Sequence, residues 1–307
     1  MLALLTAVAL LGAPATRKLA DDDEVGTFRT ITTFIAKDQV KASKHGAIRG
    51  RVNNKEGERI TNNLDKSGHW HSQSYQDYTV AQVFDFKKGG FFIDLASNEP
   101  VHISNSRALE RDYGWEGICI DGNQAMLDKL VVQRTCKVYK AVVSSESGKL
   151  VEFTAPAASS SLKDKKGRST KVDAEAGLGG ILSKTTDNKE AQPNGTDRNW
   201  VVTQHRTVTL TDILHHAKAP STIDYLSLDI EGAEYEAMST FAFDQYTILL
   251  MTIERPSKDL QALLKSKGYE YLKDHGTFGD QMWAHQSIAK QARKKLELQE
   301  GAEPKAW

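Results

Sequence analysis

Short apolar runs alternate with amphipathic segments along most of the chain after residue 72. The run from Phe91 to Leu95 is short and continuous, which is typical of a strand buried on both faces. The segment from Ser104 to Tyr113 has apolar residues at helical spacing and a polar start that can cap a helix. The pattern predicts strands at 91–95, 115–121, 137–143, 223–229, 247–253, 269–273 and 281–285. It predicts helices at 72–88, 104–113, 123–133, 209–218, 233–241 and 258–267.

This order of elements predicts an α/β fold. Strands that alternate with helices favour a mainly parallel sheet, here seven-stranded, with helices on both faces. In such a fold the crossovers are right-handed, and a ligand binds at the carboxyl ends of the strands.

Three other segments interrupt or flank this pattern. Residues 16–71 are polar and without sustained period, apart from an apolar patch near residues 31–35, so we expect an irregular N-terminal segment. Residues 154–199 are rich in Ser, Lys, Asp and Gly, which predicts a disordered or lid-like insertion in a domain of residues 72–286. Residues 287–307 are expected to form a C-terminal helix and tail.

The N-terminus has the pattern of a signal peptide over residues 1–15. An apolar run from Leu2 to Leu11 is followed by the small residues of Ala13-Pro14-Ala15. The run is too short to span a bilayer, and its alternative is an apolar helix that docks on the domain. Asn194 lies in an acceptor sequence for N-glycosylation. We therefore expect a glycoprotein of the secretory pathway, in the ER or Golgi lumen or secreted, with a cytoplasmic or organellar location as the alternative.

The charge balance narrows the class of partner. The chain has 40 Lys and Arg residues against 40 Asp and Glu residues. It therefore has no strong field to attract nucleic acid or an anionic membrane. A small neutral or polar substrate fits this balance better.

The chain has two cysteines, Cys119 and Cys136. Two cysteines exclude a disulfide scaffold and a cysteine-based structural zinc site. We expect two buried thiols, with a single disulfide as the alternative in an oxidising compartment.

Polar residues follow the first predicted strand at the point where a ligand would bind. Asp94 ends that strand, and the turn continues through Ala96, Ser97 and Asn98. A dinucleotide site would need glycines in this turn, whereas Ala96 adds a methyl group and Pro100 lacks an N–H donor. The turn therefore argues against NAD or FAD and favours S-adenosylmethionine, which has no phosphate. A strand end without a ligand is the alternative.

Two further acidic positions lie at the same predicted rim. Asp121 ends the second strand, where a carboxylate can accept hydrogen bonds from both hydroxyls of a ribose. The corner that contains Asp229, Glu231 and Glu234 directs several carboxylates to the carboxyl end of another strand. These groups can stabilise a sulfonium and accept the proton of an alcohol nucleophile, although Glu234 is the best candidate for a helix cap.

Three blocks of sequence together resemble the FkbM-type methyltransferases. They are SQSYQD at residues 72–77, the block from Phe91 to Asp121, and LSLDIEGAE at residues 226–234. The similarity covers roughly residues 72–285 and implies a class I, Rossmann-like methyltransferase fold. It implies S-adenosylmethionine as cofactor and O-methylation of a hydroxyl on a sugar, glycan or small natural product.

The resemblance also implies roles for single residues. Residues that hold the cofactor would be Asp94, Ala96, Ser97, Asn98, Asn105, Asp121 and Ala141. Of these, Asp121 would bind the ribose and Ala141 the adenine edge. Asp229 and Glu231 would be catalytic. From their place at the same rim, we also expect Glu234 and Glu254 at the substrate pocket, with an ion pair to a nearby cation as the alternative for Glu254.

We expect no metal ligands. The histidines of His69-Trp70-His71 and His215-His216 have no carboxylate at ligand spacing, so they are expected at the surface or in helix packing. The main alternative function is a catalytically inactive, methyltransferase-like binding domain of the secretory pathway, and a dehydrogenase ranks third.

Overall fold

The computed structural model describes residues 33–35, 70–156, 161–163, 169–171, 179–182, 200–276 and 278–297. The predicted signal peptide, the glycosylation sequence at Asn194 and His69 lie outside these residues. The helices are α2 (Gln76–Val83), α3 (Arg107–Tyr113), α4 (Gln124–Gln133), α5 (Leu210–Ala217), α6 (Glu234–Ser239), α7 (Lys258–Ser266) and α8 (Gln286–Glu297). None of these described helices combines the length and hydropathy needed to cross a bilayer.

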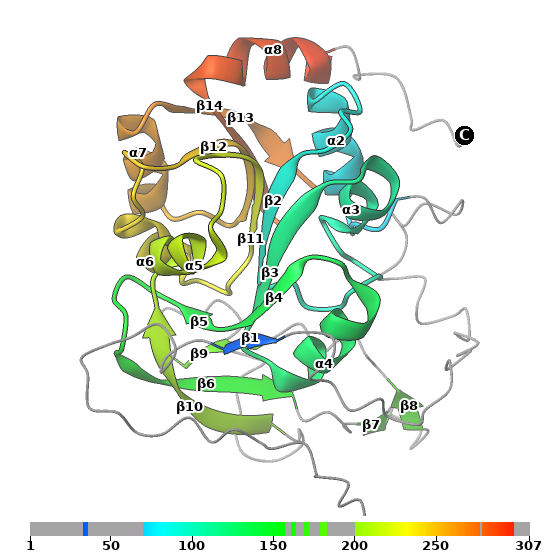
Figure 1. Cartoon of the computed structure of the whole chain (residues 1–307), viewed down its shortest axis with the longest axis vertical. Helices are drawn as coiled ribbons and strands as arrows, with labels where there is room; N and C mark the ends of the chain where they lie inside the picture. The colour runs from blue at the N-terminus through cyan, green and yellow to red at the C-terminus, as the bar shows by residue number, and fades with distance from the viewer. Residues whose placement is uncertain are drawn as a thin grey trace, which may run out of the picture.

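The described part of the chain forms a mixed eight-stranded main sheet in the order β1-β4-β3-β2-β11-β12-β14-β13 (Figure 1). Its strands are β1 (Thr33–Ile35), β2 (Phe91–Leu95), β3 (Glu116–Asp121), β4 (Lys137–Lys140), β11 (Thr222–Leu228), β12 (Thr247–Glu254), β13 (Tyr269–His275) and β14 (Asp280–His285). The five strands from β4 to β12 run parallel to one another. Strand β14 runs antiparallel to both β12 and β13, and β1 runs antiparallel to β4.

The prediction of an α/β fold is therefore confirmed in its coarse form, and three details differ. The strand predicted at 137–143 ends at Lys140, and Val142–Val143 belong to a second sheet. The main sheet has eight strands rather than seven, because the segment predicted to be irregular contributes β1 at the edge. The helix predicted from Ser72 begins at Gln76, because Tyr75 has a left-handed backbone (φ 61°) that a helix cannot include.

Helices cover both faces of the main sheet and create two apolar cores (Figure 1). Because side chains alternate along a strand, Ile93 and Leu95 pack with α5, α6 and α7, whereas Phe92 packs with α2, α3, α4 and α8. When helices cover both faces of a sheet, every side chain of a central strand is buried, which explains the continuous apolar runs in the sequence.

A second, four-stranded sheet in the order β5-β10-β6-β9 was not predicted. It contains β5 (Val142–Val143), β6 (Leu150–Pro156), β9 (Gly180–Ile181) and β10 (Trp200–Val208). Strands β6 and β10 pair antiparallel across seven residue pairs and flank the predicted insertion. The short strands β7 (Ser161–Lys163) and β8 (Ser169–Lys171) pair within that insertion.

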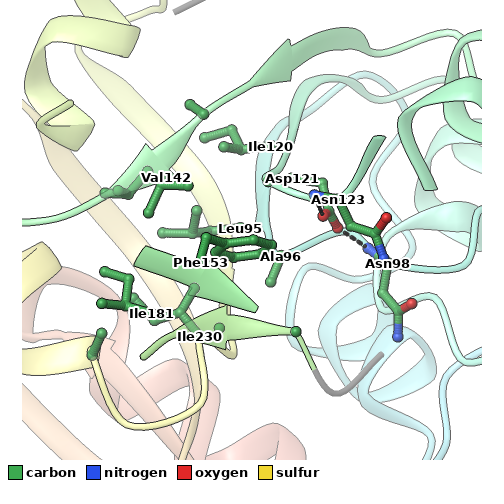
Figure 2. Close-up of a pocket in the computed structure, with 16 residues that line it drawn as sticks. Leu95, Ala96, Asn98, Ile120, Asp121, Asn123, Val142, Phe153, Ile181 and Ile230 are labelled. Atoms are coloured by element: carbon green, nitrogen blue, oxygen red, sulfur yellow. Dashed lines mark hydrogen bonds between the residues drawn. The ribbon is translucent and has the colours of Figure 1, made fainter. Parts of the chain in front are cut away.

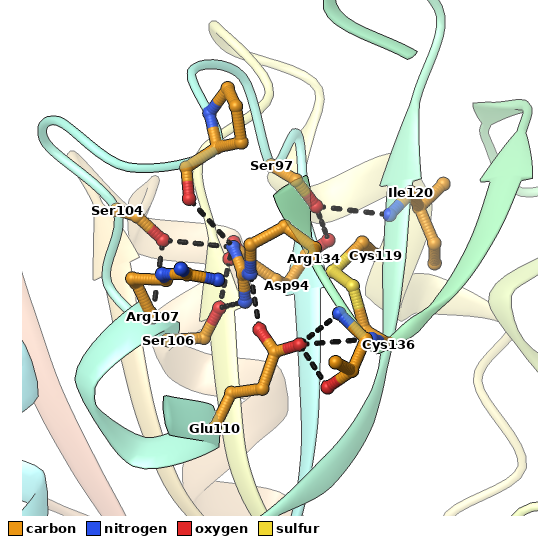
Figure 3. Close-up of a disulfide and its surroundings, with 12 residues drawn as sticks. Asp94, Ser97, Ser104, Ser106, Arg107, Glu110, Cys119, Ile120, Arg134 and Cys136 are labelled. Atoms are coloured by element: carbon orange, nitrogen blue, oxygen red, sulfur yellow. Dashed lines mark hydrogen bonds and ion pairs between the residues drawn. A yellow bond between two sulfur atoms is a disulfide. The ribbon is translucent and has the colours of Figure 1, made fainter. Parts of the chain in front are cut away.

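Cys119 and Cys136 form a disulfide, so the expectation of two free thiols is wrong. Cys119 lies in β3 and Cys136 directly precedes the neighbouring strand β4, so the sheet brings their Cα atoms to 6.0 Å. The bond joins two strands that already lie side by side (Figure 3).

A buried arginine lies next to this disulfide. The side chain of Arg134 is fully buried, forms an ion pair with Glu110 and lies 3.9 Å from Asp94 (Figure 3). Its guanidinium also donates to the hydroxyls of Ser104 (3.1 Å) and Ser106 (2.8 Å). A buried charge is tolerated when it is paired and its hydrogen bonds are satisfied, as they are here.

We predict that Arg134→Met lowers the free energy of unfolding by about 3–5 kcal/mol, because it leaves two buried carboxylates without their cation. Arg111→Met is the matched control, since Arg111 pairs with Asp112 and its side chain is 36% exposed. The control is expected to change stability by about 0–1 kcal/mol. Urea unfolding with the disulfide intact measures both, and equal losses would contradict the role of Arg134.

Candidate functional site

The structure has a pocket at the place where four parallel strands of the main sheet end. Its lining includes Leu95 of β2, Asp121 of β3, Ala141 after β4 and Ile230 after β11 (Figure 2). About 540 Å³ of space lies within it, including solvent at the mouth. Its position matches the sequence-based expectation that a ligand binds at the carboxyl ends of the strands.

Asp121 is the acidic side chain of this pocket. Its two carboxylate oxygens accept hydrogen bonds from the backbone N–H groups of Asn98 (2.8 Å) and Asn123 (2.7 Å). Each oxygen keeps a lone pair for a further donor. Burial raises the pKa of Asp121 to about 6. The side chain is thus held in place and can accept hydrogen bonds from a ligand.

The first turn borders the pocket through Ala96 and Asn98. Both residues have left-handed backbones, with φ of 64° for Ala96 and 50° for Asn98. The hydroxyl of Ser97 is directed into the protein, where it donates to the carbonyl of Asp94 (2.6 Å) and accepts from the N–H of Ile120 (3.1 Å). Ser97 therefore secures the turn, while Ala96 and Asn98 face the cavity.

Asp94 and Asn105 are not among the residues that line the pocket. Asp94 accepts a hydrogen bond from the hydroxyl of Ser106 and lies beside Arg134, and burial raises its pKa. Asn105 donates to the hydroxyl of Ser227 (2.9 Å). Because side chains alternate along β2, Leu95 is directed toward the pocket and Asp94 toward α3. A cofactor contact of these two residues stays a prediction.

An aromatic side chain of the second sheet forms part of the pocket wall. Phe153 of β6 lines the pocket together with Ala96 and Asn98 of the first turn (Figure 2), and its ring packs against His205 of β10. A Cβ at Gly122 would lie 2.8 Å from the ring, so only glycine allows this approach. Sequence reasoning missed Phe153, because a single aromatic residue beside an aperiodic segment carries no signal of a site.

The acidic corner lies beside the pocket, at the ends of β11 and β12. One carboxylate oxygen each of Asp229, Glu231 and Glu254 lies within 4.8 Å of the others. Arg255 donates to Glu254 (2.5 Å) and to Glu231 (3.4 Å). Sequence reasoning placed these acids at one rim but assigned no metal ligands, whereas the structure brings three carboxylates together.

Asp229 has the least compensated carboxylate of this corner. Its Oδ1 atom is buried and accepts no hydrogen bond from an N–H or hydroxyl donor, while the carboxyl group of Glu254 lies within hydrogen-bonding reach. Burial raises the pKa of Asp229 well above its ordinary value, and the nearby charge of Glu254 raises it further. A carboxyl group of raised pKa is a better proton acceptor near neutral pH than an ordinary aspartate.

Glu234 has a structural role within the same corner. Its carboxylate accepts hydrogen bonds from the N–H groups of Ile230 (2.9 Å) and Gly232 (3.2 Å). Burial raises its pKa to about 7. These bonds hold the turn that carries Glu231, which itself has a left-handed backbone (φ 58°). The assignment of Glu234 to the substrate pocket stays a prediction.

Three of the histidines that the sequence analysis expected at the surface or in helix packing lie in the described part of the chain, namely His71, His215 and His216. His215 contacts the side chain of Gln245 (2.8 Å), and His216 contacts the hydroxyl of Tyr139 (3.0 Å). His71 is buried, and burial lowers its pKa to about 4. None of these three belongs to the carboxylate group at the acidic corner.

An apolar pocket with a carboxylate at the carboxyl ends of parallel strands is where α/β proteins usually bind small ligands. The chain belongs to the FkbM methyltransferase family, because the methyltransferase FkbM domain matches residues 96–271, more than half of its length. The resemblance seen in the sequence is thereby confirmed. No curated protein and no solved structure matches the chain.

The backbone of the first turn gives a prediction about Ala96. A left-handed backbone costs an alanine about 1 kcal/mol relative to glycine, so Ala96→Gly should raise the free energy of unfolding by about that amount. Ala125→Gly in α4 is the control and should lower it by about 0.5–1 kcal/mol. Chemical denaturation of both variants is the measurement. A loss of stability in Ala96→Gly would mean that the methyl group itself packs favourably.

Proposed function

We propose that this protein is an S-adenosylmethionine-dependent O-methyltransferase. Membership of the FkbM methyltransferase family supports methyl transfer. The observation that carries the cofactor assignment is Asp121, a positioned carboxylate at a strand end within an apolar pocket. On this proposal the mixed main sheet is a class I methyltransferase sheet with β1 added at one edge.

The pocket suggests how the cofactor would lie. The ribose hydroxyls would donate to Asp121, whose oxygens already face the cavity beside Asn123. The adenine would contact the apolar wall of Ala141 and Phe153. The methionine part would extend along the turn of Ala96 toward the acidic corner. S-Adenosylmethionine has no phosphate, so this turn does not need the glycines of a dinucleotide site.

The acidic corner would supply the chemistry. The sulfonium methyl group transfers to an acceptor oxygen, and a carboxylate accepts the hydroxyl proton as the new C–O bond forms. Asp229 is the stronger candidate for the base, because its pKa is raised and Arg255 contacts Glu231 instead. The acceptor would be a hydroxyl of a sugar, glycan or small natural product.

The disulfide supports a location in the secretory pathway. Disulfides persist in oxidising compartments and are rare in the cytosol. Cys119 and Cys136 are paired, in agreement with the signal-peptide pattern of residues 1–15. We therefore propose that the domain of residues 72–286 works in the lumen of that pathway or outside the cell.

One observation favours an inactive relative as the second candidate. The first turn places Ala96 in a backbone conformation that glycine adopts without cost. If this turn no longer admits the cofactor, the domain would keep the fold and bind another partner. Isothermal titration with S-adenosylmethionine separates the two candidates.

We predict that Asp121→Ala weakens binding of S-adenosylhomocysteine by about 1.5–3 kcal/mol, as for hydrogen bonds to a charged group. The pKa of about 6 adds a pH dependence. As pH falls through this value, Asp121 becomes protonated and accepts hydrogen bonds less well, so affinity should fall between about pH 7.5 and 5.

Asp121→Asn is the control for this pH dependence, because an amide does not titrate in that range. Calorimetric titration of the wild type and both variants is the measurement. If the wild type and Asp121→Asn show the same pH profile, another group controls binding. Unchanged affinity in a folded Asp121→Ala variant would remove Asp121 from the site.

We predict that Asp229→Asn keeps S-adenosylhomocysteine affinity and lowers turnover by about 10²–10⁴, the usual contribution of a positioned base. Glu231→Gln should have a smaller effect on turnover if Asp229 is the base, and the larger one if the assignment is reversed. Glu270→Gln is the control, because Glu270 is exposed and pairs with Arg293 in another part of the protein. Full turnover in both site variants would show that the corner does not perform the transfer.

A further inference from the structure

We propose that Asp229, Glu231 and Glu254 bind one divalent cation of the hard, oxygen-preferring class, such as Mg²⁺ or Mn²⁺. One carboxylate oxygen from each residue lies within 4.8 Å of the others. Two oxygens that bind the same Mg²⁺ at about 2.1 Å can be at most ~4.2 Å apart. Small side-chain rotations therefore suffice to place all three oxygens around one ion.

Two buried carboxylate oxygens at this place receive no hydrogen bond from an N–H or hydroxyl donor. They are the Oδ1 atom of Asp229 and the Oε2 atom of Glu254, and the two carboxyl groups lie within hydrogen-bonding reach of each other. Glu254 is only 9% exposed, so solvent cannot readily satisfy its second oxygen. Buried polar atoms nearly always have a partner in native proteins, and a cation between these two carboxylates would be that partner.

The donor atoms of the corner are all oxygens. Asp280 faces Glu254 in the antiparallel ladder of β12 and β14, which adds a fourth carboxylate. Among the described residues, Arg255 is the basic side chain that forms ion pairs with Glu231 and Glu254. A set of oxygen donors without Cys or His favours Mg²⁺, Mn²⁺ or Ca²⁺ over zinc or copper.

The fold itself brings these carboxylates together. Leu228 of β11 pairs with Ile253 of β12, so the next residues, Asp229 and Glu254, follow at neighbouring strand ends. Glu231 returns to the same place because its left-handed backbone (φ 58°) turns the chain. The site is therefore built on two rigid parallel strands and a strained turn, which is a feature of functional positions.

The role of the ion rests on the proposed function, although its binding does not. A Cβ at Gly180, which lines the pocket, would lie 3.3 Å from Cβ of Glu231, so the corner adjoins the cavity. With the ion bound, Asp229 is a ligand and not the base: the cation binds the oxygen of the acceptor hydroxyl, lowers its pKa and orients it toward the methyl group, and the hydroxyl proton passes to solvent.

The test is a titration of the full chain with Mn²⁺, without S-adenosylmethionine, followed by the electron paramagnetic resonance signal of free Mn²⁺. We expect one Mn²⁺ per chain, displaced by excess Mg²⁺. Glu254→Gln should weaken binding by at least about tenfold, through loss of a charged ligand. Arg255→Gln should tighten binding, because it removes a positive charge beside the ion. Glu270→Gln should leave the affinity unchanged.

Circular dichroism confirms that each variant is folded, and Asp229→Asn replaces Glu254→Gln if the latter unfolds. The proposal is overturned if the wild type binds no Mn²⁺ up to about 1 mM, the weak end of protein sites for such ions. It is also overturned if Glu270→Gln weakens binding as much as Glu254→Gln, or if Arg255→Gln weakens it.

A parallel titration with S-adenosylhomocysteine in the presence of EDTA distinguishes this inference from the proposed function. Cofactor binding without Mn²⁺ binding would leave the methyltransferase proposal intact and refute the ion. Mn²⁺ binding without any cofactor binding would support the ion and refute the methyltransferase proposal.

Discussion

The fully buried guanidinium of Arg134 constrains the structure around the first strand end. A buried cation must be paired with anions and have its hydrogen bonds satisfied, and Arg134 meets this need with Glu110, Asp94 and two serine hydroxyls. These partners come from β2, from the start of α3 and from α3 itself. Glu110 also accepts from the backbone N–H of Thr135, which fixes the approach to β4. The turn that borders the pocket is therefore anchored by a charge on the opposite face of the sheet.

Three aspartates at the strand ends have different electrostatic surroundings. Asp94 lies beside Arg134, Asp121 accepts two backbone N–H groups, and the Oδ1 atom of Asp229 receives no N–H or hydroxyl donor. Among the described residues, Asp94 has a cation beside it, Asp121 in the pocket has hydrogen-bond donors but no cation, and Asp229 at the acidic corner has the fewest donors. A carboxylate with few donors or cations around it tends to take up a proton or a metal ion. Of the three aspartates, Asp229 is therefore the best candidate for such a role.

Much of the fold and the rim of the site could be predicted from the sequence. Buried parallel strands appear as continuous apolar runs, which located Phe91 to Leu95 and its neighbours, and the acids that follow such runs lie at one rim. The partner of Asp94 could not be predicted, because Arg134 is an isolated basic residue at the end of a helix 40 positions away. The disulfide was left open because spacing alone does not decide the redox state of Cys119 and Cys136. Phe153 was missed because long-range pairing with β10, rather than a local pattern, makes its strand.

The two walls of the pocket have different origins in the chain, and this matters for specificity. The main sheet supplies Asp121 and the first turn. The second sheet supplies Phe153 and Gly180, and its strands β6 and β10 flank the aperiodic residues of the insertion. Because Gly180 also packs against Glu231, this sheet contacts both the pocket and the acidic corner. On the proposed function, changes in the second sheet would alter which acceptor reaches the carboxylates, while the main sheet would keep the ribose position at Asp121 fixed. A family that keeps one cofactor and varies its acceptors would need this separation of the two walls.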